Sequence, residues 1–385
     1  MRDTFLPFSP PDLGEEEIQE VVDSIRSGWI TTGPKVRQFE QDFAAYLAAP
    51  TALAVSSATD AMLVALATLG IGPGDEVITT TMTFCSTLHV VEHLGARPVL
   101  VDVRPDTLNM DPEAVSKAIT RRTRCIMPVH LYGHPCDMDE LIGLAERHGL
   151  YVVEDAAHAL PARYHERMVG TIGALTAFSF YATKNLTTAE GGMLTGAPEL
   201  IDQARIWSLH GMSRDAFNRY QAEGSWCYEV VLPGFKCNMT DIQAALGLAQ
   251  LRRLPQMQAR RRTIVERYNA AFADIPELEL PIVKPWVEPS WHLYVVRLNL
   301  DRLTIDRSRF IGELKERNIG ASVHFIPNHI QPYYRDRYGY KPADFPVAYH
   351  EYQRLVSLPL SPALSDQDVA DVIEAVTDIV RLFRR

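Results

Sequence analysis

The sequence lacks the features that mark disulfide-rich, zinc-binding and membrane-spanning proteins. Its five cysteines are odd in number and scattered, without a C-x-x-C pair, which argues against a disulfide framework and a zinc knuckle. No stretch approaches the ~18 uninterrupted apolar residues of a membrane-spanning helix, and the first residues lack the apolar run of a signal peptide. We therefore expect a cytoplasmic protein without membrane contact.

A basic excess is also missing. The chain has 38 Lys and Arg residues against 48 Asp and Glu residues, a net charge of −10, which argues against nucleic acid binding through a broadly basic surface. Apolar sequence is abundant, because 46% of the 385 residues are hydrophobic. The chain can therefore bury a sizeable core, and its length corresponds to roughly two or three domains.

Short β-branched runs alternate with amphipathic helical patterns between residues 50 and 196, which predicts a mostly parallel sheet covered on both faces. A helix over residues 14–27 precedes it, with Ile18, Val21, Val22 and Ile25 on one face and Gly28 at its end. We assign residues 1–250 to this large domain. The expected strands are residues 52–56, 76–80, 98–103, 125–130, 150–154, 175–180 and 193–195.

The C-terminal part begins with a long helix, opened by a capping-box pattern at Thr240 and Gln243. We expect Pro255 to bend or restart this helix and Arg260, Arg261 and Arg262 to lie on a solvated face. Three prolines between residues 281 and 289 mark a composition shift. We assign residues 251–385 to a smaller domain, with strands expected at 292–298 and 321–325 and helices at 308–318 and from Ser365 onward.

Lys184 and Asp155 are the strongest candidates for chemistry. Lys184 follows an apolar strand, where burial lowers the pKa of an amine and makes it a usable nucleophile; an ordinary loop lysine is the alternative. Asp155 ends a parallel strand, at the edge where α/β sheets bind ligands. A lysine that forms a Schiff base, together with an aspartate that pairs with a pyridinium nitrogen, is typical of pyridoxal phosphate sites.

Two further segments suit such a cofactor. Residues 55–61 turn from a strand into a helix through small residues, so that backbone amides can approach a phosphate, although serine and threonine also cap helices that bind nothing. Phe84 follows the second strand and could stack on a flat ring, or it could be a core phenylalanine.

In their order along the chain, these segments resemble the DegT/DnrJ/EryC1/StrS aminotransferases, which use pyridoxal phosphate to aminate keto sugars attached to nucleotides. The resemblance covers most of the chain and implies the pyridoxal phosphate fold type I, an α/β fold with a large, mostly parallel seven-stranded sheet domain and a smaller C-terminal α/β domain. The matching motifs are the turn at 55–61, Thr83-Phe84, residues 154–158, 179–185, 190–192 and 234–245.

The resemblance implies catalytic roles for three residues. Lys184 would form the Schiff base and act as general acid and base, Asp155 would pair with the pyridine nitrogen, and His158 would lie near the 3′ oxygen of the cofactor.

It also implies how the rest of the cofactor is held. Ala58, Thr59 and Ser179 would bind its phosphate, and Phe84 would stack on its ring. Asn238 would reach the phosphate of the neighbouring subunit's cofactor, so that the active unit is a homodimer with shared active sites. Ala58 stands where glycine is more usual, which costs this turn conformational freedom.

The resemblance is to the branch that aminates C4 of the sugar. The implied reaction moves an amino group from L-glutamate or glutamine to a nucleotide-diphospho keto sugar, with pyridoxamine phosphate between the two halves. TDP-4-keto-6-deoxy-D-glucose is the favoured substrate, in deoxyamino sugar biosynthesis, and UDP-4-keto-pentose, UDP-4-keto-hexose and C3 amination are the alternatives. The expected substrate contacts are Asn185, Trp226, His324 and His329, and the excursion at 211–233 is expected to help cover the nucleotide.

Other classes of function also fit parts of the sequence. Some relatives are sugar dehydratases with histidine at the Schiff-base position, against which Lys184 argues, and a regulator could bind the cofactor without turnover. His89, Glu92 and His93 match the H-x-x-E-H pattern of a metallopeptidase. Because no segment offers a third ligand, we expect no metal site.

Overall fold

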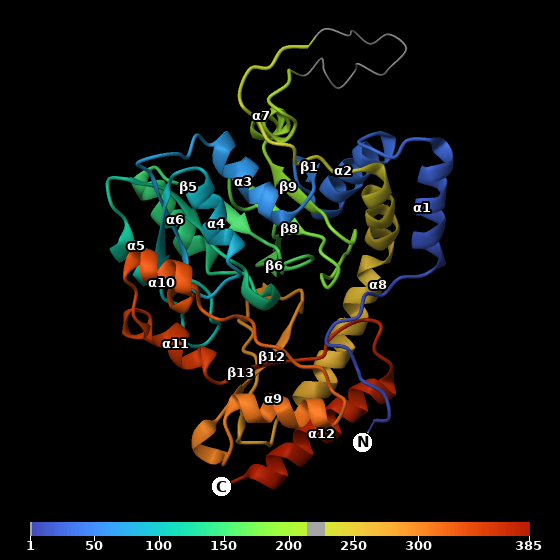
Figure 1. Cartoon of the computed structure of the whole chain (residues 1–385), viewed down its shortest axis with the longest axis vertical. Helices are drawn as coiled ribbons and strands as arrows, with labels where there is room; N and C mark the ends of the chain where they lie inside the picture. Colours follow the sequence, from blue (N-terminus) through green and yellow to red (C-terminus); the bar gives the residue numbers. More distant parts are fainter. Residues whose placement is uncertain (1, 214–227) are drawn as a thin grey trace.

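The computed structural model describes residues 2–213 and 228–385. Seven strands form its central sheet, namely β1 (Thr51–Val55), β2 (Glu76–Thr80), β3 (Arg97–Val101), β4 (Thr123–Met127), β5 (Tyr151–Asp155), β8 (Leu175–Ser179) and β9 (Gly192–Gly196). Their order is β1-β9-β8-β5-β4-β2-β3 (Figure 1). Only β9 runs antiparallel to its neighbours in this sheet, which confirms the predicted fold class.

Helices cover both faces of this sheet. One face packs against α3 (Ala58–Thr68), α4 (Ser86–His93) and α7 (Pro198–Ser208), and the other against α2 (Pro34–Leu47), α5 (Pro112–Ala118), α6 (Met138–His148) and α8 (Asp241–Phe272). Side chains alternate along each strand, so in β5 Val153 packs beside α3 while Val152 packs beside α6. Because both faces of the sheet are buried, the sequences of the strands are continuous apolar runs.

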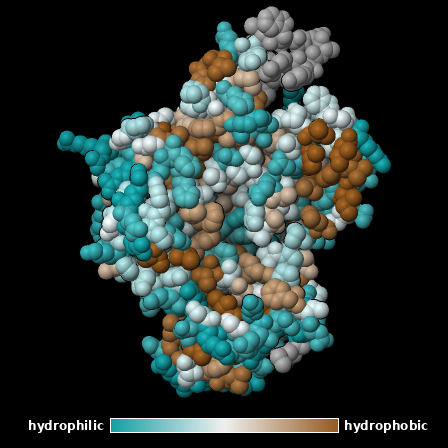
Figure 2. All heavy atoms as spheres, viewed as in Figure 1, coloured by the Kyte–Doolittle hydropathy of each residue, from teal (hydrophilic) through white to brown (hydrophobic). Residues whose placement is uncertain are grey.

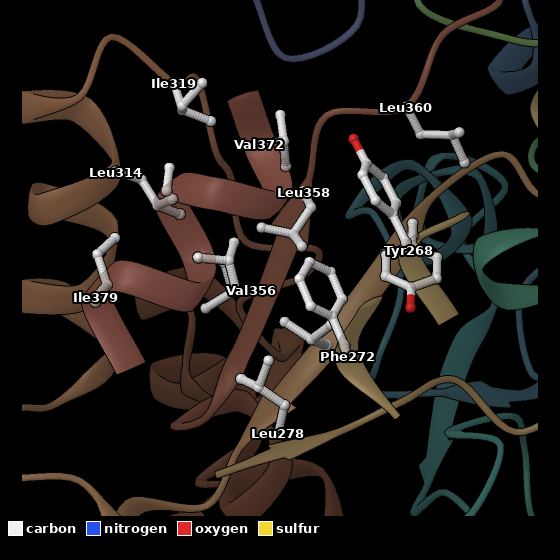
Figure 3. Packing of buried hydrophobic residues seen from close by; sticks show 14 of the residues in the cluster. Tyr268, Phe272, Leu278, Leu314, Ile319, Val356, Leu358, Leu360, Val372 and Ile379 are labelled. Atoms are coloured by element: carbon white, nitrogen blue, oxygen red, sulfur yellow. The ribbon is translucent and has the colours of Figure 1, made fainter. Parts of the chain in front are cut away.

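A second core lies in the C-terminal part, where Tyr268 and Phe272 of α8 meet Val356, Leu358 and residues of the last helix (Figure 3). Its elements are β10 (Leu278–Glu279), β12 (Tyr294–Leu298), β13 (Leu355–Leu358), α9 (Arg307–Glu316) and α12 (Asp366–Phe383). The predicted domain boundary after residue 250 falls within α8, which contributes side chains to both cores. The division into two domains stays a prediction.

The remaining elements are short, apart from the first helix. They are α1 (Glu15–Ser27), α10 (Pro332–Tyr338), α11 (Pro346–Tyr352), β6 (Arg163–Tyr164), β7 (Arg167–Met168), β11 (Val287–Glu288) and 3-10 turns at Leu131–Gly133, Leu300–Arg302, Asn328–Ile330 and Pro342–Asp344. None of the helices in the described ranges is both long and apolar enough to cross a bilayer.

Two expectations about the C-terminal half were wrong, and a third was wrong in part. Pro255 does not restart its helix, because α8 continues from Asp241 to Phe272 and is packed into a core on each side of the proline. Residues 321–325 form no strand, and only Ser322 makes an isolated bridge, to Ser357. Arg261 is buried, because successive helical residues are about 100° apart and three in a row cannot all face the solvent.

The first helix turns a polar side toward the protein. Glu17 and Ser24 are its buried residues, and the Glu17 carboxylate accepts hydrogen bonds from Gln250 and Arg253 of α8, both at 2.7 Å. The apolar face that the sequence predicts therefore points outward, and Ile18 and Ile25 are 55% and 57% exposed.

A glycine on α8 generates a stability prediction. A Cβ atom at Gly247 would lie 2.5 Å from the ring of Phe39, which is fully buried between Phe43 and Phe180. We expect Gly247→Ala to lower the free energy of unfolding by about 1–3 kcal/mol through overpacking, measured by urea denaturation. Gly312→Ala on α9 meets no atom within 4 Å and should be stabilising by ~0.5–1 kcal/mol; equal effects of the two changes would contradict this account.

Candidate active site

A cavity of about 480 Å³ lies at the carboxyl ends of β5 and β8, where Asp155 and Ser179 line it. Its wall also includes the start of α3, the segment after β2 and two C-terminal segments around His292 and His324. The cavity brings together eight residues that the sequence singles out: Ala58, Thr59, Phe84, Asp155, His158, Ser179, Lys184 and His324.

Lys184 and Asp155 share this cavity and act on each other's charge. Burial lowers the pKa of the Lys184 amine to about 8, and the Asp155 carboxylate opposes part of that shift. Burial also raises the pKa of Asp155, against hydrogen bonds from Thr87 and Ala157 and the charge of Lys184. The amine is thus available in its neutral form near neutral pH, as a nucleophilic lysine requires.

Two hydrogen bonds fix the orientation of Asp155. The backbone N–H of Ala157 donates to Oδ1 at 3.1 Å, and the hydroxyl of Thr87 donates to Oδ2 at 2.8 Å. Thr87 is not among the residues predicted from the sequence. It lies in the first turn of α4, the helix that follows β2, three residues after Phe84, and this position beside a predicted ring-stacking residue was the available signal.

The start of α3 suits an anion. Ala58 and Thr59 line the cavity within the first turn of the helix, where backbone amides have no acceptor in the helix itself. Because Ala58 is already helical, the turn does not need a glycine at this position. The close approach occurs instead at Gly192, where a Cβ atom would lie 2.4 Å from the backbone carbon of Ser57.

Three histidines lie near Lys184, of which His158 and His292 are buried and His324 is half-buried. Burial holds the pKa of His158 and of His292 well below the usual value and lowers that of His324 to about 4, with the Lys184 charge contributing to each. All three are therefore neutral at pH 7. The ring centroids of His158 and His292 are 4.4 Å apart, and Nδ1 of His158 accepts from the N–H of Tyr132 at 3.3 Å, which leaves the proton of neutral His158 on Nε2.

His292 is a cavity residue that the sequence analysis missed. Its signal was a histidine at the start of a predicted apolar strand. Asn185, expected to contact substrate, is buried and does not line the cavity. It donates to the Ser290 carbonyl at 2.7 Å and turns its oxygen toward Nδ1 of His292 at 3.2 Å.

Two other expected site residues, His329 and Asn238, do not line the cavity in the described part of the chain. His329 is fully buried, with Nδ1 2.8 Å from the Thr81 hydroxyl. Asn238 pairs with Val55 of β1 and donates to the Thr32 hydroxyl at 2.7 Å. Trp226 lies outside the described residues, as does most of the excursion at 211–233.

The cavity residues fit pyridoxal phosphate. A lysine with a lowered pKa can bond the aldehyde, an aspartate in the same cavity can hold a protonated ring nitrogen, and the first turn of α3 offers amides to the phosphate. Phe84 is 59% exposed at the cavity and lies 6.1 Å from the ring of Phe325, so a flat ring can meet an aromatic wall.

The H-x-x-E-H segment is used differently. Glu92 accepts a hydrogen bond from the hydroxyl of Tyr338 at 2.6 Å and pairs with Arg337 at 3.3 Å. The rings of His89 and His93 are 6.2 Å apart. In the described ranges no group of three or more His, Cys, Asp or Glu side chains could hold a metal ion.

Comparison with known proteins agrees with this geometry. The sequence profile of the DegT/DnrJ/EryC1/StrS aminotransferase family matches residues 11–377. The spore coat polysaccharide biosynthesis protein SpsC of Bacillus subtilis is 55% identical over 382 residues, which are 99% of this chain and 98% of that protein. Among solved structures, Spr1654 from Streptococcus pneumoniae, a candidate sugar aminotransferase, matches in its PMP form with a TM-score of 0.93 and 40% identity over 98% of this chain and 99% of that chain. Its PLP form matches with a TM-score of 0.92 and 39% identity over the same shares.

The lowered pKa of Lys184 can be measured without any ligand. In the cofactor-free protein, we expect the acylation rate of Lys184 by trace acetic anhydride to rise with pH and to level off above about pH 8. Mass spectrometry of the labelled peptides gives this rate, with exposed Lys117 as an internal reference whose pKa is raised by Glu113. In Asp155→Asn the pH midpoint of Lys184 acylation should fall, because the carboxylate raises the pKa of Lys184. A midpoint equal to that of Lys117 would contradict the burial argument.

Proposed function

The chain belongs to the DegT/DnrJ/EryC1/StrS aminotransferase family and is a pyridoxal phosphate-dependent sugar aminotransferase, and from this premise we propose that it aminates C4 of a nucleotide-linked 4-keto sugar. L-Glutamate is the proposed donor, with glutamine as the alternative. TDP-4-keto-6-deoxy-D-glucose is the proposed acceptor. The observation that carries the proposal is the joint placement of Lys184, Asp155, the first turn of α3 and His324 around one cavity.

The proposed roles follow from the environment of each side chain. When bound, pyridoxal phosphate supplies an electron-accepting ring for the carbon that exchanges its amine. Lys184 would hold the cofactor and would move the proton at that carbon, for which a pKa of about 8 is suited. Asp155 would keep the ring nitrogen protonated, and His158 would donate from Nε2 to the 3′ oxygen.

The remaining cavity residues hold and orient. Ser179, Ala58 and Thr59 bind the phosphate, and Phe84 packs on the ring. His324 is the proposed sugar contact, because it lines the cavity and its Nδ1 is engaged by the Ser357 hydroxyl at 2.8 Å, which leaves Nε2 for a ligand. Asn185 and His329 are buried and do not line the cavity, so neither is proposed to contact the substrate directly.

The proposed active unit is a homodimer. Leu13, Ile18, Ile25, Trp29 and Ile30 are large apolar residues that the structure leaves exposed, and Figure 2 shows hydrophobic residues gathered on the surface over α1. Contiguous apolar patches of this kind mark interaction sites. Asn238 is hydrogen-bonded to Thr32, directly after this segment, which supports a role for Asn238 at the partner's cofactor phosphate.

An assay with a small panel tests the reaction. We expect 2-oxoglutarate and an amino sugar to form when glutamate is supplied with the TDP-linked 4-keto sugar, detected by mass spectrometry, with the aminated carbon assigned by NMR. Lys184→Ala should lower kcat by about 10²–10⁴-fold or more, because it removes the proton-transferring amine, and Lys117→Ala should leave kcat unchanged. UDP-linked 4-keto sugars and 3-keto sugars are the competing acceptors, and cofactor binding without turnover of any of them would favour a regulator.

Hybrid dimers test whether the active sites are shared. We expect Asn238→Ala to weaken cofactor binding and Lys184→Ala to abolish activity. A mixed dimer of the two variants would contain one site with both native residues. Each mixed dimer should therefore have up to about half the activity of a wild-type dimer. Size-exclusion chromatography with light scattering verifies the dimer, and Ile18→Asp is expected to weaken it. Absence of any recovery in verified mixed dimers would contradict a shared site.

A further inference from the structure

A chain of two buried hydroxyl groups begins at Asp155. The hydroxyl of Thr87 lies 2.8 Å from Oδ2 of Asp155, and the hydroxyl of Thr83 lies 2.8 Å from that of Thr87. Thr87 is fully buried and Thr83 is 2% exposed. Only Thr83 of these two lines the cavity, so Thr87 touches the carboxylate and not the ligand space.

Counting protons gives this chain a direction. A threonine hydroxyl has one proton, and the acceptors near Thr87 are the Asp155 carboxylate at 2.8 Å and the Phe84 carbonyl at 3.1 Å. The carboxylate is the nearer and stronger acceptor, so Thr87 donates to Asp155. Thr83 then supplies its own proton to the oxygen of Thr87, and the two bonds polarise each other.

The segment that carries these hydroxyls is itself held from the C-terminal part. The side chain of Asn328, which is 1% exposed, donates to the backbone carbonyl of Thr83 at 2.7 Å and to that of Thr81 at 3.2 Å. The Asn328 N–H also donates to the Thr81 carbonyl, at 2.9 Å. The backbone of Thr83, which carries the outer hydroxyl of the chain, is thus fixed from the C-terminal part.

We propose that Thr87 is a positioning residue for the reaction, which through its hydroxyl keeps Asp155 ionised and aimed at the ring nitrogen of the cofactor. The proposal rests on the role given to Asp155 in the proposed function. A buried carboxylate is stable as an anion only when hydrogen bonds or a cation replace its water. The bonds from Thr87 and Ala157 do this on one side and leave the remaining lone pairs of Asp155 for the ring nitrogen.

Such a role has a signature that a packing role lacks. Thr87 should matter for a ligand whose ring nitrogen carries a proton and much less for a ligand without that nitrogen. A carbocyclic analogue of pyridoxal phosphate, with C–H in place of the ring nitrogen, keeps the aldehyde, the 3′ oxygen and the phosphate. Comparing the two ligands therefore isolates the contact that Thr87 supports.

The experiment measures dissociation constants of both ligands by absorbance titration of the cofactor-free protein. We expect Thr87→Val to weaken pyridoxal phosphate binding about tenfold or more, since a hydrogen bond to a charged group is lost, and to change analogue binding less than about twofold. Thr87→Ser, which keeps the hydroxyl, should restore wild-type affinity. If the valine variant does not fold, Thr87→Ala removes the same hydroxyl without adding bulk.

Two further variants distinguish a failure of the proposal for Thr87 from a failure of the role given to Asp155. Thr79→Val is the matched control, because Thr79 is a fully buried threonine whose hydroxyl donates to the Met127 carbonyl at 2.8 Å, and it should leave both affinities unchanged. Asp155→Asn should abolish the preference for the ligand with the ring nitrogen. Adding Thr87→Val to Asp155→Asn should change the two affinities little further. Equal losses for both ligands in Thr87→Val, or no loss, would overturn the proposal for Thr87. An unaltered preference in Asp155→Asn would instead overturn the role of Asp155.

Discussion

The charges of Lys184 and Asp155 are buried at one edge of the central sheet, and the pairing of three strands keeps them together. Asp155 ends β5 opposite Ala177 of β8, and Ser179 ends β8 opposite Gly192 of β9. Lys184 lies in the connection between β8 and β9. Burying either charge alone is costly, so the site depends on a strand register that delivers both to the same cavity. A one-residue slip would turn Asp155 to the other face.

The neighbour of Asp155 on β5 shows how that register is secured. Glu154 points to the opposite face, where its carboxylate accepts hydrogen bonds from the Gly173 N–H and the Thr176 hydroxyl, both at 2.7 Å, and meets Nε2 of His130 at 2.9 Å. Nδ1 of His130 accepts from the Cys136 N–H at 3.1 Å, so His130 holds its proton on Nε2 and donates it. The two consecutive acidic residues thus have different roles. Glu154 anchors the end of the strand by hydrogen bonds, and Asp155 lines the cavity.

Most of the fold, and eight of the residues that line the cavity, could be predicted because they depend on local sequence. The seven strands lie within three residues of their predicted bounds, since buried parallel strands are continuous apolar runs. Contacts between residues far apart in the sequence could not be predicted in the same way. The burial of Arg261 and the outward face of α1 depend on which side of each helix meets the rest of the chain, and the place of Asn185 depends on Ser290 and His292, more than a hundred residues away. Hydropathy along one helix contains no such information.

Arg261 connects the scaffold to the site. It lies on α8, the helix that both cores share, and one guanidinium nitrogen donates to the carbonyls of Trp291, His292 and Leu360 at 3.2–3.4 Å. Burial lowers its pKa to about 10, which leaves it charged at neutral pH. A buried cation held by carbonyl oxygens ties the segment that carries His292 to α8 and places positive charge close enough to help lower the pKa of His292. That charge, with Lys184 and the amides of α3, makes the region around the cavity suitable for an anionic cofactor although the whole chain carries a net charge of −10.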